Sequence, residues 1–323
     1  MLSTPVIAGI KQLHPESELW LMTTPQAREL VRHDPLVAGV LTFDKRSGDG
    51  GIVGLLGKAR ELREQGFSRA YSVHRSFRSA LLLWLARIPC RVGFADAGFS
   101  FLYHTRVFRD PARHDVLRRL AVLSPEIDLS LLPQDLRLFS IQLADARPPI
   151  RDFIMHPGRY VMLAPGSVWP TKRWDKQGYR DLAQALITHG LRVALVGSAE
   201  EKPLCDEIGA GVACSNFAGM SSLGELLLLV KNSSLMVSND SLAQHLASAF
   251  KVPLVVIFCA TSPAFGCGPW RTRSIVVERK GLTCKPCAPH GGMRCPTGTE
   301  ACMREVPCKD VLKAALELLE KPK

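Results

Sequence analysis

The chain has 323 residues, of which 46% are hydrophobic, and its formal net charge is +11 at pH 7. This length and composition predict a packed globular protein of two domains and exclude an intrinsically disordered one. The longest apolar runs, of which residues 80–86 are one, are much shorter than the roughly 18 residues that a transmembrane helix needs. The chain does not start with a basic segment followed by an apolar one, which predicts a cytoplasmic protein without a secretory signal.

Short apolar strands alternate with amphipathic helices along the first half of the chain. Pro25 and Ser76 suit the first turns of helices, and Gly66 suits a helix end. The predicted strands cover residues 19–22, 39–43, 70–73 and 91–94, and the predicted helices cover 26–32, 52–65 and 76–86.

The second half repeats this alternation with more strongly apolar strands. The predicted strands cover residues 160–163, 192–196, 235–237 and 254–258, and the predicted helices cover 176–189, 202–209, 223–231 and 241–250. Nearly continuous apolar strands separated by helices are typical of parallel sheets with both faces covered. We therefore predict an α/β fold with two doubly wound, Rossmann-like domains.

Prolines at positions 125, 133, 148, 149 and 157 indicate a linker between the two domains. We expect an N-terminal domain over residues 1–145, a C-terminal domain over 146–308, and a last segment, 309–323, whose helix covers 309–319. Many arginines lie between Arg60 and Arg119. They indicate either a solvated basic surface or a face for an acidic acceptor or an anionic membrane. Lys and Arg form no dense run, so nucleic acid is not a predicted partner.

Two strand-to-helix junctions in the second half carry residues suited to an anion. In a parallel sheet such junctions share one edge, where helix N-termini offer unpaired N–H groups. At the first junction, Lys172 follows the small-residue loop that contains Ser167. Lys172 either neutralises a diphosphate or is a surface lysine. Trp174 is predicted to be a packing residue.

At the second junction, Asp240 ends a strand and either faces a ligand or caps the next helix. Ser241 and the amides of Leu242 and Ala243 are predicted to face a bound anion. His245, one helical turn further on, either contacts the ligand or packs.

A third loop on the same predicted edge contains Glu200 and Glu201. A carboxylate there either accepts hydrogen bonds from ribose hydroxyls or complements a helix dipole, and the sequence does not distinguish the two glutamates. Together the three loops predict a pocket for a sugar nucleotide, and therefore a glycosyltransferase.

The chain resembles the ADP-heptose:lipopolysaccharide heptosyltransferase family, glycosyltransferase family 9, whose fold is GT-B. The resemblance covers nearly the whole chain. It is most specific in the loop 165–174, with its lysine before a tryptophan, and in segment 240–245, which matches an Asp-Ser/Thr-Gly-x-x-His signature. Segment 74–79 also resembles a family segment near the cleft.

The resemblance assigns roles to particular residues. It implies that the diphosphate is held by Lys172 and by Ser167, Asp240, Ser241 and the amides that follow, while Glu201 approaches the ribose. It also implies that Met220 lies by the adenine.

The sequence departs from the family pattern at two places. Leu242 replaces the glycine of the signature, which removes freedom for close approach of the backbone to phosphate. Family members begin with a strand and a Gly-Asp pair before a Thr-Pro, and here only Thr4 and Pro5 match. The expected general base, an aspartate, falls before Met1. No residue of this chain inherits that role, and His74 is the first substitute to test.

The resemblance implies an inverting enzyme that moves a heptose, or a similar sugar, from an ADP-sugar to a glycolipid of the lipopolysaccharide-core type. It implies no cofactor for the transfer, and a peripheral location at the cytoplasmic face of the inner membrane. The alternative is a non-catalytic nucleotide-sugar or glycolipid binding protein that keeps the GT-B fold without its base.

A cysteine-rich loop covers residues 284–308. It contains Cys284, Cys287, Cys295, Cys302 and Cys308. Such a density in a reducing compartment indicates either a metal ion or free, redox-active thiols. The metal interpretation predicts a structural zinc site made by the first four.

Overall fold

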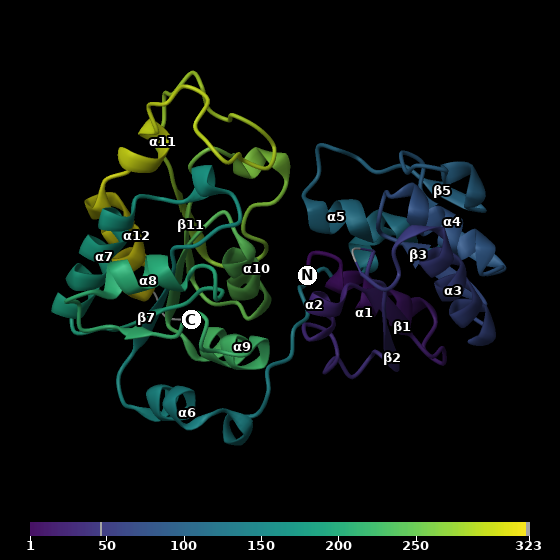
Figure 1. Cartoon of the computed structure of the whole chain (residues 1–323), viewed down its shortest axis with the longest axis horizontal. Helices are drawn as coiled ribbons and strands as arrows, with labels where there is room; N and C mark the ends of the chain where they lie inside the picture. The colour runs from purple at the N-terminus through teal and green to yellow at the C-terminus, as the bar shows by residue number, and fades with distance from the viewer. Residues whose placement is uncertain (46, 321–323) are drawn as a thin grey trace. The chain divides into compact units, whose positions relative to one another are not determined.

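The computed structural model describes residues 1–45 and 47–320 and divides into two compact units (Figure 1). Unit 1 covers Met1–Arg137 and unit 2 covers Leu138–Lys323. The boundary falls inside the predicted linker but before residue 145, where we expected it, and the C-terminal helix belongs to unit 2. Within the described ranges, no helix is long and apolar enough to cross a membrane.

Unit 2 is built on a parallel sheet with the strand order β11-β10-β9-β6-β7-β8. The strands are β6 (Tyr160–Ala164), β7 (Arg192–Leu195), β8 (Ser215–Asn216), β9 (Leu235–Asn239), β10 (Leu254–Ile257) and β11 (Ser274–Val277). In the central pair, Val161 lies opposite Leu235 and Leu163 opposite Val237. Every residue of β6 and β9 is buried because helices cover both faces of the sheet.

Helices pack on both sides of this sheet, with α7, α8 and α12 on one side and α9 and α10 on the other (Figure 1). The helices of unit 2 are α6 (Pro148–Met155), α7 (Lys176–Thr188), α8 (Lys202–Gly209), α9 (Leu223–Asn232), α10 (Leu242–Ala249), α11 (Ala301–Arg304) and α12 (Cys308–Glu320). The last helix, α12, packs on α7 and on strands β9, β10 and β11. Its buried face, which includes Val311 and Leu318, is therefore part of the unit 2 core.

Unit 1 contains the same kinds of element around two smaller parallel sheets, β1-β2 and β3-β4-β5. Its strands are β1 (Trp20–Thr23), β2 (Gly39–Thr42), β3 (Arg69–Ser72), β4 (Cys90–Phe94) and β5 (Thr105–Val107). Its helices are α1 (Thr4–Leu13), α2 (Pro25–Arg28), α3 (Gly51–Glu64), α4 (Phe77–Leu85) and α5 (Asp115–Leu120). Residues of both β1 and β3 line a cavity of about 230 Å³, and every residue of β1 is partly exposed.

This architecture confirms the predicted α/β class with two Rossmann-like units. Helix α2 ends at Arg28, before the predicted residue 32, and the chain continues in turns in which the N–H groups of Val31 and Arg32 donate to the Arg28 carbonyl. Helices α1 and α6 were not predicted. Helix α6 shows that the proline-rich stretch is not wholly a linker, because Pro148 occupies its first turn, where proline is favourable.

Candidate functional site

A pocket of unit 2 lies at the carboxyl ends of β6, β7 and β9, where open parallel sheets bind their ligands. Its volume is about 590 Å³, within the range of small-molecule sites. The loops after these strands supply most of its polar lining, and residues of α9 and α10 supply an apolar wall. Of the residues predicted from sequence, those that line the pocket are Ser167, Lys172, Glu201, Asp240, Ser241, Leu242 and Ala243.

Asn239, the last residue of β9, joins the first two loops to each other. Its side-chain N–H donates to the Pro165 carbonyl at 2.7 Å, and its side-chain carbonyl accepts from the Trp174 N–H at 3.0 Å. The guanidinium of Arg173 donates two hydrogen bonds, of 2.9 and 2.6 Å, to the Ser167 carbonyl. Trp174 is buried and stacks edge-to-face on Tyr179, which confirms its predicted packing role. The loop that carries Lys172 therefore has a defined shape.

Lys172 and Asp240 form an ion pair inside the pocket. The Lys172 ammonium lies 2.7 Å from the Asp240 carboxylate, and the two side chains are only 13% and 10% exposed. The same carboxylate accepts hydrogen bonds of 2.7 Å from Gln244 and from Thr261. Since a nearly buried carboxylate needs such partners, Asp240 is fully compensated and Lys172 is held at the pocket wall.

Helix α10 points its N-terminus into the pocket. The alternative interpretation of Asp240 as its cap is wrong, because the N-cap residue is Ser241 and the Asp240 carboxylate is committed to other partners. The Ser241 side chain makes no capping hydrogen bond. The first-turn N–H groups have no partner within the helix, so those of Leu242 and Ala243 are suited to an anion.

Glu201 lies against the first loop at a distance that only glycine permits. A Cβ atom at Gly166 would lie 2.0 Å from the Glu201 carboxyl carbon. The Glu201 carboxylate accepts a hydrogen bond of 2.9 Å from the Ser198 N–H. Glu200 is exposed and does not line the pocket, so of the two glutamates only Glu201 is placed to contact a ligand in it.

Beside the pocket, Glu225 anchors the start of α9. It forms a capping box with Ser222 and is paired with Arg147, whose guanidinium lies 2.6 Å from its carboxylate. Hydrogen bonds from Arg147 lower the pKa of Glu225 to about 2, although burial opposes this shift. Arg147 also donates to the Met220 carbonyl. This network fixes the wall that Ser222 and Leu223 form.

Two predicted residues do not line the pocket. Met220 is half exposed just outside it, and His245 lies on α10 behind the first turn. Trp169 was not singled out from the sequence, although it lines the pocket and is 37% exposed. The sequence did contain a sign of this role, a tryptophan in the loop 165–174, because its ring can stack on a base or a sugar.

The cysteine-rich loop contacts the loop that carries Lys172. Thr171 and Gly292 exchange hydrogen bonds, with the Thr171 hydroxyl donating to the Gly292 carbonyl at 3.0 Å and accepting from its N–H at 2.8 Å. A Cβ atom at Gly291 would lie 3.0 Å from the Lys172 side chain. The loop therefore helps to position Lys172.

The structure does not support the predicted zinc site. No group of three or more His, Cys, Asp or Glu side chains in the described part of the chain is placed to hold a metal ion, and the ten cysteines are free thiols. Three of the four proposed ligands have other surroundings. Cys302 is buried in the unit 2 core, Cys295 contacts the Thr297 hydroxyl at 3.4 Å, and Cys287 bonds the Cys284 carbonyl.

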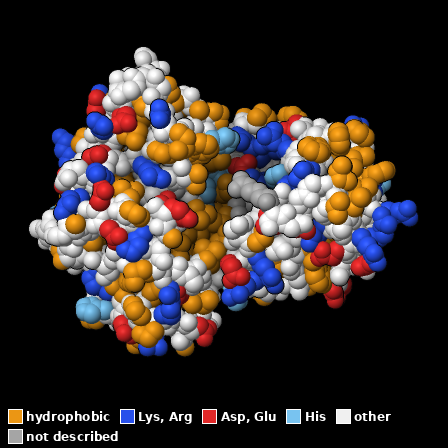
Figure 2. All heavy atoms as spheres, viewed as in Figure 1, with side chains coloured by type: hydrophobic (Ala, Val, Ile, Leu, Met, Phe, Trp, Pro, Cys, Tyr) orange, Lys and Arg blue, Asp and Glu red, His pale blue; other side chains and the backbone are white. Residues whose placement is uncertain are grey.

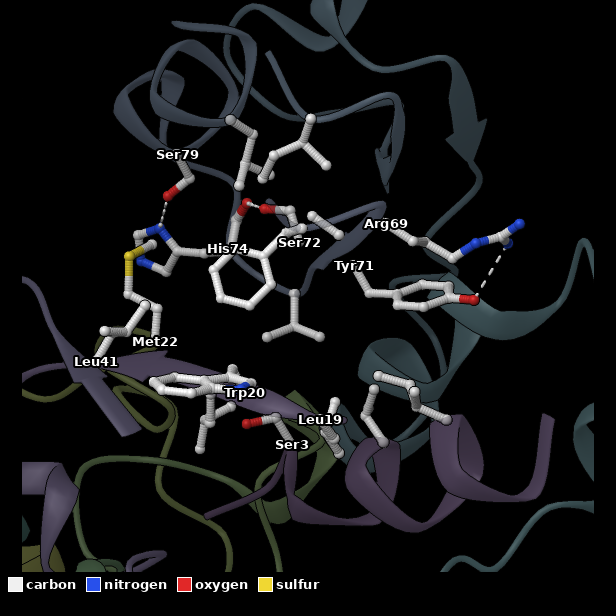
Figure 3. Close-up of a pocket in the computed structure, with 18 of the residues that line it drawn as sticks. Ser3, Leu19, Trp20, Met22, Leu41, Arg69, Tyr71, Ser72, His74 and Ser79 are labelled. Carbon is white, nitrogen blue, oxygen red and sulfur yellow. Dashed lines mark hydrogen bonds between the residues drawn. The ribbon is translucent and has the colours of Figure 1, made fainter. Parts of the chain in front are cut away.

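In unit 1, the cavity between β1 and β3 has an apolar centre and polar ends (Figure 3). At one end Tyr71 donates to Glu126 at 2.6 Å. At the other end His74 accepts a hydrogen bond of 3.3 Å from the Ser76 N–H at Nδ1. Burial, and then the charges of Lys45, Arg119 and Arg75, lower the pKa of His74. While Nδ1 accepts this hydrogen bond, the neutral ring carries its proton at Nε2 and can donate there.

The chain is similar in sequence to heptosyltransferases. The sequence profile of glycosyltransferase family 9 (heptosyltransferase) matches residues 56–293. Lipopolysaccharide heptosyltransferase 2 of Salmonella typhimurium is 28% identical over 280 residues, which cover 82% of this chain and 80% of the relative.

Two solved structures share the fold over nearly the whole chain. One is a glycosyl transferase family 9 protein from Veillonella parvula, with a TM-score of 0.86, 19% identity, and coverage of 98% of this chain and 93% of that one. The other is ADP-heptose lps heptosyltransferase II of E. coli, with a TM-score of 0.77, 24% identity, and coverage of 98% and 94%.

Proposed function

We propose that this chain, which belongs to glycosyltransferase family 9, transfers a heptose or a similar sugar from an ADP-sugar to a glycolipid of the lipopolysaccharide-core type, with inversion. The observation that carries the proposal is the pocket of unit 2. There an uncapped helix N-terminus and the Lys172 ammonium lie at one sheet edge. Its volume of about 590 Å³ suits a nucleotide sugar.

Each part of the donor has a complementary group in this pocket. The diphosphate accepts hydrogen bonds from the N–H groups of Leu242 and Ala243 and lies beside Lys172. Glu201 accepts from ribose hydroxyls. The adenine packs on the apolar wall that Leu223 and Leu226 help to form.

Inversion requires a single displacement at the anomeric carbon. The acceptor hydroxyl attacks, the bond to the diphosphate oxygen breaks, and negative charge develops on the leaving ADP. The start of α10 and Lys172 stabilise that charge without reorganisation, because the ion pair and Asn239 already hold them in place. A base must accept the proton of the acceptor hydroxyl, and we assign that role to no residue of this chain.

The proposed setting is the cytoplasmic face of the inner membrane, with the protein bound peripherally. The net charge of +11 supports attraction to an anionic surface. Calorimetry with ADP, ADP-heptose and UDP tests the donor assignment. We expect one equivalent of ADP or ADP-heptose to bind and UDP to bind more weakly. No binding of ADP-heptose would contradict the proposal.

A further inference from the structure

Unit 1 exposes a cluster of phenylalanine side chains. Phe77, Phe99 and Phe101 are 47%, 45% and 70% exposed. Their rings contact one another in a chain, with centroid distances of 5.5 Å from Phe77 to Phe99 and 5.7 Å from Phe99 to Phe101. We call these three residues the phenylalanine cluster. Contiguous exposed apolar patches mark interaction surfaces far more often than single exposed residues do.

The backbone holds this cluster outward at a conformational cost. Phe99 has φ 57° and ψ 34°, the left-handed region, which is unfavourable for a bulky residue. The Gly98 N–H donates to the Arg75 carbonyl at 3.0 Å, and a Cβ atom at Gly98 would lie 2.9 Å from that of Phe77. The loop is thus packed tightly beneath side chains that it leaves exposed, a combination typical of functional surfaces.

The surroundings of the cluster are strongly basic. Residues 75–113 include seven arginines and two aspartates, with no lysine or glutamate. One aspartate, Asp96, is shared by Arg75 at 3.1 Å and Arg109 at 3.4 Å. Arg106 is exposed and makes no ion pair with any described residue. Figure 2 shows hydrophobic side chains gathered over α4 and β5, with Lys and Arg side chains beside them.

We propose that the phenylalanine cluster and Arg106 dock unit 1 on the surface of an anionic phospholipid bilayer. Aromatic rings suit the interface between headgroups and acyl chains, and arginines around them complement phosphate charge. The cluster also lies at the carboxyl-end edge of strands β3 and β4, the edge at which a parallel sheet binds ligands. The inference rests on the proposed function in one respect, since a glycolipid acceptor would be presented at such a surface.

Sedimentation with phosphatidylglycerol/phosphatidylethanolamine vesicles tests this surface with the full chain. Phe99→Asn combined with Phe101→Ser should weaken partitioning by about tenfold or more, and asparagine tolerates the left-handed backbone. Arg106→Gln should weaken it by about fivefold at low salt, and high salt should abolish that difference. The matched control is Met155→Ser on α6 of unit 2, a residue 66% exposed, which should partition like the unmodified chain.

Several outcomes would overturn the proposal. One is failure of the unmodified chain to bind the vesicles, and another is equal binding by the phenylalanine double variant. A third is a dimer in size-exclusion chromatography that the double variant disrupts, because the surface would then be the interface with a second copy of the chain. ADP calorimetry and sugar transfer to detergent-solubilised acceptor are measured on the same variants. If the unmodified chain transfers no sugar to the detergent-solubilised acceptor, the proposed function is contradicted. The membrane-docking proposal is decided separately, by binding to the vesicles.

Discussion

Replacing Lys172 with methionine separates its structural role from its proposed role in binding. Methionine keeps much of the side-chain volume and removes the ammonium that lies 2.7 Å from Asp240. Breaking a buried ion pair lowers the free energy of unfolding by about 3–5 kcal/mol. We expect the lower end of this range because the two side chains are still 13% and 10% exposed. Loss of the charge-assisted phosphate contact should cost a further 1.5–3 kcal/mol in ADP affinity, about 10- to 150-fold.

The double variant Lys172→Met/Asp240→Asn is the matched control. Asparagine removes the carboxylate charge left without a partner, so the free energy of unfolding in urea should recover to within about 1 kcal/mol of the original. ADP affinity measured by calorimetry should stay at least about tenfold weaker, because the phosphate still lacks its cation. A double variant that binds ADP as tightly as the unmodified chain would show that Lys172 only stabilises the fold.

Three further predictions concern the same unit. Gly166→Ala should weaken ADP binding by about tenfold by displacing Glu201, which a new Cβ would meet at 2.0 Å, whereas Gly57→Ala, where a Cβ has open space, should not change it. The pKa of Glu225 is lowered to about 2, below its unfolded value of about 4.3. Its ionised carboxylate therefore adds at most about 3 kcal/mol to the free energy of unfolding, a contribution that is present above about pH 4.3 and is lost as the pH falls through about 2. Glu225→Gln should therefore flatten the acid side of the stability curve, and an unchanged curve in urea unfolding would contradict this. Hydrogen bonds from Thr297 and the Glu300 backbone lower the pKa of Cys295 to about 7, so mass spectrometry after iodoacetamide at neutral pH should find this thiol labelled first; protection of the loop thiols until a chelator is added would show a bound metal ion instead.

The strand-to-helix junctions were predictable from sequence because local patterns specify them. An apolar run followed by small and polar residues places Ser167 and Ser241 at the edge where parallel strands end. Strands β6, β7, β9 and β10 were predicted for a similar reason, since burial on both faces leaves an uninterrupted apolar run. Strands β8 and β11 were not predicted, because they are only partly buried and lack such a run.

Contacts between distant segments were not predictable in this way. The alternative in which Asp240 caps α10 is wrong because two of its partners, Lys172 and Thr261, come from other loops that only the fold brings together. Arg147 is distant in sequence from Glu225, and the pattern around either residue contains no sign of the pair. The surroundings of the cysteine thiols depend likewise on how the loop packs, and their spacing alone suggested a metal site that the structure does not support.

The central claim is that this chain transfers a sugar from an ADP-sugar. The most direct measurement incubates the full chain with ADP-heptose and a heptose-deficient lipopolysaccharide core, and follows ADP release together with the mass of the acceptor. The account predicts that each acceptor gains a heptosyl group with one equivalent of ADP released, and that Lys172→Met/Asp240→Asn slows both. Tight binding of ADP-heptose with no gain in acceptor mass would contradict it and would identify the chain as a binding protein on the same fold.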